Sequence, residues 1–175
     1  FLGEIESSGA AHSPFLIDGL AWTVRLISLI LGGILVLVAW NQVDDGVAAE
    51  CHACLLSIIA GVNITAASND LITLFLGLEL VSIPTYVLLY LPRRSSASQD
   101  ATLKYFLLSA FSSAVLLYGF AMMYGATGTT SLPSIQRTLE TTTTASSPLL
   151  LLAVPFIIAG IGFRITAVPF HFYAP

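Results

Sequence analysis

The sequence predicts an all-α membrane protein with about five transmembrane helices. Of its 175 residues, 56% are hydrophobic and only 9% are charged, and the mean hydropathy is +0.89. Soluble domains carry roughly 25% charged residues, so this chain has too few charges to cover a water-facing surface. Its apolar residues form runs of about 20, the length of helix that crosses ~30 Å of hydrocarbon. The runs lack the alternation of a β-barrel, which leaves helices as the form that satisfies every backbone hydrogen bond inside a bilayer.

Five apolar segments, separated by polar joints, define the expected helices. In order, they cover about residues 20–40, 51–67, 71–91, 101–124 and 148–168. We therefore divide the chain into an extramembrane lead-in, residues 1–19, and a transmembrane helical domain, residues 20–175. The chain does not begin with Met, and we expect it to be incomplete at both ends.

The first two expected helices carry few groups that suggest chemistry. In the first, Arg25 lies near one end, where anchoring at the membrane surface is the favoured interpretation. The second opens with the stretch CHAC, in which Cys51 and Cys54 flank His52. A metal site needs more ligands at separated positions, and covalent haem attachment needs the histidine after the second cysteine. We therefore interpret these residues as one helical turn at the mouth of an apolar segment and expect no metal site.

The third expected helix holds Glu79, the ninth of its 21 residues and therefore close to the middle of the membrane. A charge at that depth costs about 2.5–3.5 kcal/mol on insertion scales, which makes it a candidate functional group. Ser82 and Tyr86 follow three and seven residues later on the same helical face, and Pro84 removes a backbone donor beside them. This pattern predicts a carboxyl group that takes up and releases a proton. The alternative is one half of a structural ion pair between two helices.

The fourth expected helix carries Lys104 in its first turn, followed by Ser109, Ser112 and Ser113. From the first turn, the ammonium group could reach the membrane surface along its own flexible side chain. Small polar residues such as the three serines, in contrast, favour close contacts between helices in membranes. On these residues alone, a structural and a functional role for Lys104 both stay open.

The fifth expected helix places Arg164 deep in an apolar segment, five residues before Pro169. Proline ends or kinks a helix, and broken helices at membrane depth occur where they line a cavity or are covered by protein, often at ion sites. We therefore expect a broken helix near Pro169. His171 lies just past the break, and its imidazole exchanges protons near neutral pH. Packing at the membrane interface is the alternative role for His171.

The polar joints predict the orientation of the chain. Arg93 and Arg94 lie in the joint between the third and fourth helices, which the positive-inside rule places on the cytoplasmic side or its organellar equivalent. The lead-in and the longest joint, residues 125–147, then lie on the opposite side. Because that joint is rich in Thr and Ser, we expect it to be an exposed loop.

Three stretches of the chain resemble a known family. They are FLGLELVSIPTYVL (residues 75–88), DATLKYFLLSAFSSAVLLYGFAMMYGATGTT (100–130) and GIGFRITAVPFHFYAP (160–175). In this order they are similar to subunit N, also called chain 2, of proton-pumping NADH:quinone oxidoreductase, the respiratory complex I family. Weaker similarity extends back to FLIDGLAW, so the resemblance covers roughly residue 15 to the C-terminus. A lone Glu-x-x-Ser-x-Pro would be unspecific, whereas three motifs in the same order are specific.

The resemblance implies a fold and a set of functional residues. The family folds as a fourteen-helix antiporter-like bundle of two inverted repeats with broken helices, and the five segments resemble its third to seventh helices. Glu79 matches an essential glutamate that is paired with lysines, and Lys104 matches a lysine of the same charged axis. Arg164 stands where the family has lysine. Because arginine effectively does not lose its proton, we expect Arg164 to act on Glu79 through its charge and not to pass on a proton.

The resemblance also implies a function within a larger assembly. We expect a membrane-arm subunit of a proton-translocating NADH:quinone oxidoreductase, in contact with other membrane-arm subunits and the lipid bilayer, with no nucleic-acid partner. The alternatives are a subunit of a multi-subunit cation/proton antiporter and a non-pumping structural remnant of the membrane arm.

The sequence indicates that the redox chemistry belongs to other subunits. It contains no Gly-rich nucleotide loop, no iron–sulfur cysteine set and no haem ligand pair. We therefore expect no cofactor in this chain, and NADH, FMN, iron–sulfur clusters and quinone in partner subunits. The expected location is an energy-transducing membrane: the bacterial inner membrane, with the mitochondrial inner and thylakoid membranes as alternatives.

Overall fold

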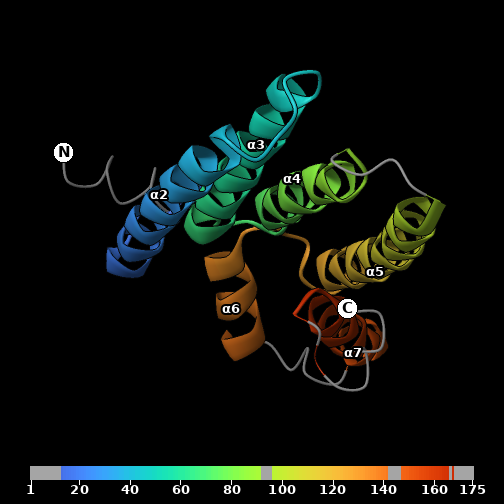
Figure 1. Cartoon of the computed structure of the whole chain (residues 1–175). Coiled ribbons are helices and arrows are strands. Elements are labelled where there is room, and N and C mark those ends of the chain that lie inside the picture. Colours follow the sequence, from blue (N-terminus) through green and yellow to red (C-terminus); the bar gives the residue numbers. More distant parts are fainter. Residues whose placement is uncertain (1–12, 92–95, 142–146, 166, 168–175) are drawn as a thin grey trace. The chain divides into compact units, whose positions relative to one another are not determined.

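The computed structural model describes residues 13–91, 96–141, 147–165 and 167, and the regular structure in these ranges is helical (Figure 1). In order, the helices are α2 (Gly19–Trp40), α3 (Ala48–Ala67), α4 (Leu71–Tyr90), α5 (Ser96–Thr127), α6 (Leu132–Thr141) and α7 (Pro148–Arg164). Two isolated β-type bridges accompany them, Phe15 with Ser68 and Asp70 with Ser131. The predicted all-α class is confirmed.

The lengths and surfaces of the helices suit a membrane. Helices α2 to α5 are long and apolar enough to cross one, and α7 is a shorter apolar helix of 17 residues. Large apolar side chains along α2 lie on the outside, and Leu20, Leu37 and Trp40 are 72–73% exposed. A continuous apolar surface of this kind needs lipid or another membrane helix around it. The chain is therefore a multi-pass membrane protein, as predicted.

The helix bounds differ from the prediction at α5 and α7. Helix α5 begins at Ser96, five residues earlier than predicted, because polar residues can extend a helix beyond the hydrocarbon. Helix α7 ends at Arg164, whereas the prediction continued to residue 168. Four residues of the sequence argument lie outside the described part of the chain: Arg93, Arg94, Pro169 and His171. The predicted break near Pro169 stays a prediction.

The expectation of an exposed loop over residues 125–147 is wrong, since α6 occupies ten of these residues. The Thr-rich composition concealed an amphipathic helix, whose apolar residues recur at helical spacing around Ile135. Ile135 is 6% exposed. On the exposed face, Gln136 Nε2 donates a hydrogen bond of 2.9 Å to Glu140 Oε1. A short helix with one buried face therefore follows α5, where composition alone indicated a loop.

The chain divides into two compact units. The first, which we call the α3/α4 unit, consists of residues 17–67 and 74–109 and holds α2, α3, most of α4 and the first part of α5. The second, the α6/α7 unit, consists of residues 1–16, 68–73 and 110–175 and holds the rest of α5 with α6 and α7.

Glycines bring α3 and α4 into backbone contact within the α3/α4 unit. A Cβ atom added at Gly61 would lie 2.9 Å from the Val81 nitrogen, and one added at Gly77 would lie 2.9 Å from the Thr65 nitrogen. Neither position has room for a side chain, which is how small residues permit close helix packing in membranes. Because Gly77 precedes Glu79 by two residues, this contact sets where the backbone of Glu79 lies against α3.

A second pair of glycines joins α5 and α7 within the α6/α7 unit. A Cβ atom added at Gly119 would lie 2.9 Å from the Ile157 nitrogen, and one added at Gly160 would lie 2.9 Å from the Leu116 Cα atom. The Ser112 hydroxyl also donates a hydrogen bond of 3.0 Å to the Gly160 carbonyl. The two helices are therefore held backbone to backbone one turn before α7 ends.

The turn before α4 is tied to the segment before α6. The Leu71 N–H donates a hydrogen bond of 2.9 Å to the Thr130 carbonyl. One carboxylate oxygen of Asp70 accepts from the Ile72 N–H at 2.8 Å, and the other accepts from the Thr130 hydroxyl. A carboxylate that accepts a first-turn N–H group caps the helix. Asp70 therefore begins α4 and ties its first turn to the segment before α6.

Candidate functional site

Glu79 lies at the ninth residue of α4 and is half-buried. Ser82 and Tyr86, three and seven residues further on, are 8% and 9% exposed, whereas Ile83, on another side of the helix, is 55% exposed. The polar stripe that the spacing predicts therefore lies on the side of α4 that turns toward the protein. A carboxyl group there meets other side chains instead of lipid.

Pro84 lies inside α4, and the helix continues through it. Because proline has no N–H group, nothing at this position donates to the carbonyl of Leu80, one residue after Glu79. The Ser82 hydroxyl donates to the Leu78 carbonyl of its own helix at 2.9 Å, an arrangement that often accompanies bending. Helix α4 is therefore locally weakened directly beside its carboxylate.

Tyr86 joins α4 to α5 within the α3/α4 unit. Its hydroxyl donates a hydrogen bond to Ser109 Oγ. Its ring makes edge-on contacts with Tyr105 and Phe106, at centroid distances of 5.4 and 5.5 Å, and pairs of this kind contribute about 0.5–1.5 kcal/mol each beyond the area that they bury. Sequence spacing placed Tyr86 on the stripe but did not identify these partners, which belong to another helix.

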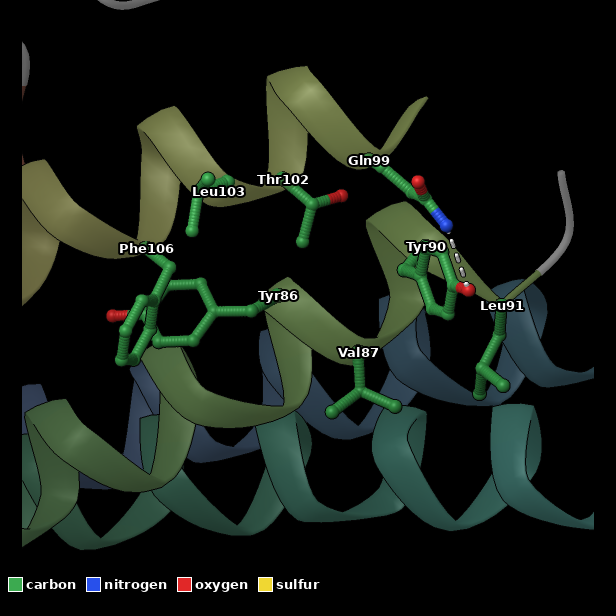
Figure 2. A pocket seen from close by; sticks show the side chains of 8 residues that line it. All are labelled: Tyr86, Val87, Tyr90, Leu91, Gln99, Thr102, Leu103 and Phe106. Atoms are coloured by element: carbon green, nitrogen blue, oxygen red, sulfur yellow. Dashed lines mark hydrogen bonds between the residues drawn. The ribbon is translucent and has the colours of Figure 1, made fainter. Parts of the chain in front are cut away.

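An apolar groove of about 500 Å³ lies between α4 and α5 beside Tyr86 (Figure 2). It is lined by Tyr86, Val87, Tyr90, Leu91, Gln99, Thr102, Leu103 and Phe106. Figure 2 shows Tyr86 and Phe106 at one end, while at the other end Gln99 Nε2 donates a hydrogen bond of 3.3 Å to the Tyr90 hydroxyl. The Tyr86 hydroxyl points away from this second end. The groove could not be predicted from the sequence, because its walls come from two helices whose relative packing depends on contacts along both.

Lys104 lies in the third turn of α5 and not, as predicted, in the first, because α5 begins at Ser96. Its side chain is exposed. The five residues that lengthen the helix, Ser96–Asp100, include four polar ones, so the start of the apolar part still lies close to Lys104. An ammonium group at such a boundary can reach water or a neighbouring protein helix, and the position of Lys104 suits either role.

Arg164 is the last residue of α7 and is half-buried. Its Nη2 atom donates a hydrogen bond of 2.8 Å to Ser113 Oγ on α5, and Ser113 is 8% exposed. A cation in the last turn also interacts favourably with the carbonyl groups at the end of a helix. Ser113 and the end of α7 therefore help to hold the guanidinium group within the α6/α7 unit.

The CHAC stretch lies at the start of α3. His52 Nδ1 is 2.6 Å from the Ala48 carbonyl, and the His52 ring meets Trp40 of α2 edge-on at a centroid distance of 6.0 Å. Cys51 is buried, Cys54 is half-buried, and both are free cysteines. Across the described ranges, no group of three or more His, Cys, Asp and Glu side chains is placed to hold a metal ion. These contacts place the stretch in the packing of α3 against α2.

The candidate residues are thus distributed over both units. Glu79 and Lys104 lie in the α3/α4 unit, on α4 and α5, and Arg164 lies in the α6/α7 unit. Tyr86 and Ser109, which the sequence argument noted without pairing them, are added to the α3/α4 group by their hydrogen bond.

Residues 68–175 match the family described as NADH:quinone oxidoreductase/Mrp antiporter, TM. The matched segment contains α4 to α7 and with them Glu79, Lys104 and Arg164. It also contains both residues of the Tyr86–Ser109 hydrogen bond.

Curated relatives extend the similarity toward the N-terminus. The NADH-quinone oxidoreductase subunit N of Myxococcus xanthus is 44% identical over 126 residues, which are 72% of this chain and 24% of that relative. The NADH-quinone oxidoreductase subunit N of Desulforamulus reducens is 37% identical over 163 residues, which are 92% of this chain and 34% of that relative. The chain therefore spans about a quarter to a third of the length of these relatives.

Solved structures contain similar chains as well. A chain of respiratory complex I from Thermus thermophilus with bound aureothin has a TM-score of 0.74 and 33% identity, over 94% of this chain and 35% of that one. A chain of the membrane-bound sulfane sulfur reductase, an archaeal respiratory membrane complex, has a TM-score of 0.77 and 22% identity, over 92% of this chain and 32% of that one. At that identity the second likeness is one of fold.

Proposed function

The chain belongs to the NADH:quinone oxidoreductase/Mrp antiporter transmembrane family, and from this premise we propose that it is part of a membrane-arm subunit that moves protons while quinone is reduced in other subunits. The observation that carries the proposal is the position of Glu79 on the inward side of α4, beside Pro84 and inside the matched segment. Ionisable groups at mid-membrane depth are costly and mark proton or ion pathways by default.

In the proposed cycle, Glu79 takes up a proton from one side of the membrane and releases it to the other. Lys104 and Arg164 supply positive charge that favours the ionised carboxylate, and a shift of that charge relative to Glu79 alternately loads and releases the proton. We assign His171 to the proton path, because imidazole exchanges protons near neutral pH, whereas the guanidinium group of Arg164 stays charged and supplies a fixed positive charge. No bond other than O–H and N–H forms or breaks in this chain.

We assign the redox cofactors, NADH, FMN, iron–sulfur clusters and quinone, to partner subunits. An iron–sulfur cluster needs about four thiolates, and the chain has two cysteines in one helical turn, Cys51 and Cys54. The chain would then contribute to a translocating enzyme without a redox centre of its own. Its partners are the other membrane-arm subunits, and its location is an energy-transducing membrane, for which we propose the bacterial inner membrane.

A second candidate function is cation/proton antiport in a multi-subunit antiporter. The family description, which includes Mrp antiporters, supports it. The two functions share a mid-membrane carboxylate but differ in their partners and in their driving force. Copurification of the chain with flavin and iron–sulfur subunits favours the first, and sodium-dependent proton release from vesicles without such subunits favours the second.

The test is a Glu79→Gln variant of the complete complex, assayed for NADH-driven proton uptake in inverted membrane vesicles. Glutamine keeps the shape of the side chain but cannot carry the charge, and we expect uptake at least about tenfold lower, since acid–base groups contribute ~10²-fold or more. Glu140→Gln is the matched control, because Glu140 is exposed on α6. Unchanged uptake in Glu79→Gln, at normal amounts of complex, would leave the chain as a structural part of the membrane arm.

A further inference from the structure

Tyr86 and Glu79 stand on opposite sides of a weak point in α4. Pro84 lies between them, two residues before Tyr86, and the backbone hydrogen bond that it removes is the one to Leu80. A helix with one missing hydrogen bond bends there more readily than elsewhere. The part of α4 that carries Glu79 can therefore move slightly against the part that carries Tyr86.

The part of α4 after the proline is fastened to α5. The hydroxyl of Tyr86 donates to Ser109, and the ring meets Tyr105 and Phe106 edge-on. These three partners lie within five residues of one helix, so that a single side chain of α4 is held by one short stretch of α5. We call these four residues the Tyr86 latch.

The hydroxyl matters to the latch because Tyr86 lines a groove. Tyr86 forms an end wall of the apolar groove of about 500 Å³ between α4 and α5 (Figure 2). Tyr86 is 9% exposed, but a ring that borders a groove has fewer van der Waals contacts to hold it than a ring packed on every side. The hydrogen bond to Ser109 restrains that movement.

We propose that Tyr86 is a positioning residue for proton handling at Glu79. The Tyr86 latch holds the second part of α4 on α5, so that α4 bends at Pro84 when Glu79 gains or loses its proton. Without the latch, the same change in protonation moves the end of α4 toward the groove, and α4 no longer bends at Pro84. This inference rests on the proton-handling role proposed for Glu79. It adds Tyr86, which has no part in the proposed function as stated above.

The test uses four single variants and one double variant of the complete complex in inverted vesicles. Tyr86→Phe removes the donor and keeps the ring with its edge-on contacts, and Ser109→Ala removes the acceptor. Ser109→Thr restores a hydroxyl at the same position. Tyr90→Phe is the matched control, since it removes the same group one turn later on α4, where the hydroxyl accepts a 3.3 Å bond from exposed Gln99.

We expect NADH-driven proton uptake about threefold to tenfold lower in Tyr86→Phe and Ser109→Ala, the change that the loss of one typical hydrogen bond produces in an equilibrium. Ser109→Thr and Tyr90→Phe should stay within about twofold of the unmodified complex. In the double variant Tyr86→Phe/Ser109→Ala, uptake should equal that of either single variant, because both remove the same bond.

An infrared measurement separates positioning from mere support of the fold. The vibrational band of the Glu79 carboxyl group is identified by its disappearance in Glu79→Gln, and we expect it to be displaced in Tyr86→Phe but not in Tyr90→Phe. If the band is not displaced in Tyr86→Phe, the inference is overturned. This holds even if that variant yields less assembled complex. Normal uptake in Tyr86→Phe beside impaired uptake in Glu79→Gln would overturn it as well and leave the proposed function standing. Normal uptake in Glu79→Gln, in contrast, removes the proposed function itself.

Discussion

A hydrogen bond of 2.8 Å joins Nη2 of Arg164, the last residue of α7, to Oγ of Ser113 on α5. The Ser113 hydroxyl accepts from the guanidinium group and helps to orient it. Because arginine effectively never loses its proton, this position carries a permanent positive charge. Packing sets the orientation of the guanidinium group that carries it. A field of that kind suits an electrostatic role in a membrane protein and does not suit a proton relay.

Substitution of Arg164 distinguishes an electrostatic role of this residue from a role in passing on a proton. If the charge alone is required, Arg164→Lys should keep proton uptake nearly intact, while Arg164→Ala should lower it about fivefold or more, the scale of a coupling between two sites. Uptake is measured in inverted vesicles at matched amounts of complex. Equal activity in all three proteins would exclude an electrostatic role for this position.

Gly77→Ala should destabilise the complex. Its added Cβ would lie 2.9 Å from the Thr65 nitrogen, a backbone atom that cannot turn aside, and overpacking of this kind costs about 1–3 kcal/mol. Gly33→Ala on α2 is the control, since nothing lies within 4 Å of its added Cβ, and alanine is the better helix former there. Thermal inactivation of the purified complex measures the stability of the two variants. A midpoint temperature for Gly77→Ala at or above that of Gly33→Ala would contradict the backbone contact.

Gly160→Ala should have the same effect on the packing of α5 against α7. The new methyl group would lie 2.9 Å from the Leu116 Cα atom, and Leu116 is fully buried. At Gly125, also on α5, the nearest atom is the end of the Leu149 side chain at 3.4 Å, so Gly125→Ala should be tolerated. The comparison is made on the thermal midpoint and on the amount of assembled complex; similar values for the two variants would mean that α5 and α7 can separate without cost.

Asp70→Ala should loosen the beginning of α4. The substitution removes the acceptor for the Ile72 N–H at 2.8 Å and the bond to the Thr130 hydroxyl, and the loss of a cap costs about 0.5–2 kcal/mol. Asp70→Asn keeps an oxygen for the cap and should be milder. Asp100→Ala, at an exposed position near the start of α5, is the control, and limited proteolysis of the complex reports the difference. Equal cleavage rates in Asp70→Ala and Asp100→Ala would show that the cap contributes little.

Much of the fold could be predicted from local pattern. The apolar segments of about 20 residues correspond to α2, α3, α4, α5 and α7, because a bilayer forces each segment to satisfy its own backbone hydrogen bonds as a helix. Helix α6 was missed because a ten-residue helix is stabilised by one buried face and not by composition. The early start of α5 at Ser96 was missed for a related reason, since hydropathy marks the edge of the hydrocarbon and not the end of the helix.

The candidate site shows the same division. The spacing of Glu79, Ser82 and Tyr86 was enough to place them on one face, and the structure turns that face inward. Which residue of α5 meets Tyr86 depends on the rotation and offset of two helices, and these are decided by packing over their whole length.

The amino-acid sequence was enough to predict a set of membrane helices, with a carboxylate near the middle of one apolar segment and an arginine in another. These features follow from the cost of exposing backbone groups and charges to hydrocarbon, which is local to each segment. Three contacts became visible only in the folded chain: the glycine contact of α3 with α4, the hydrogen bond from Arg164 to Ser113, and the hydrogen bond from Tyr86 to Ser109. Such contacts join residues far apart in the chain, and they arise only when side chains of different helices fill the same space.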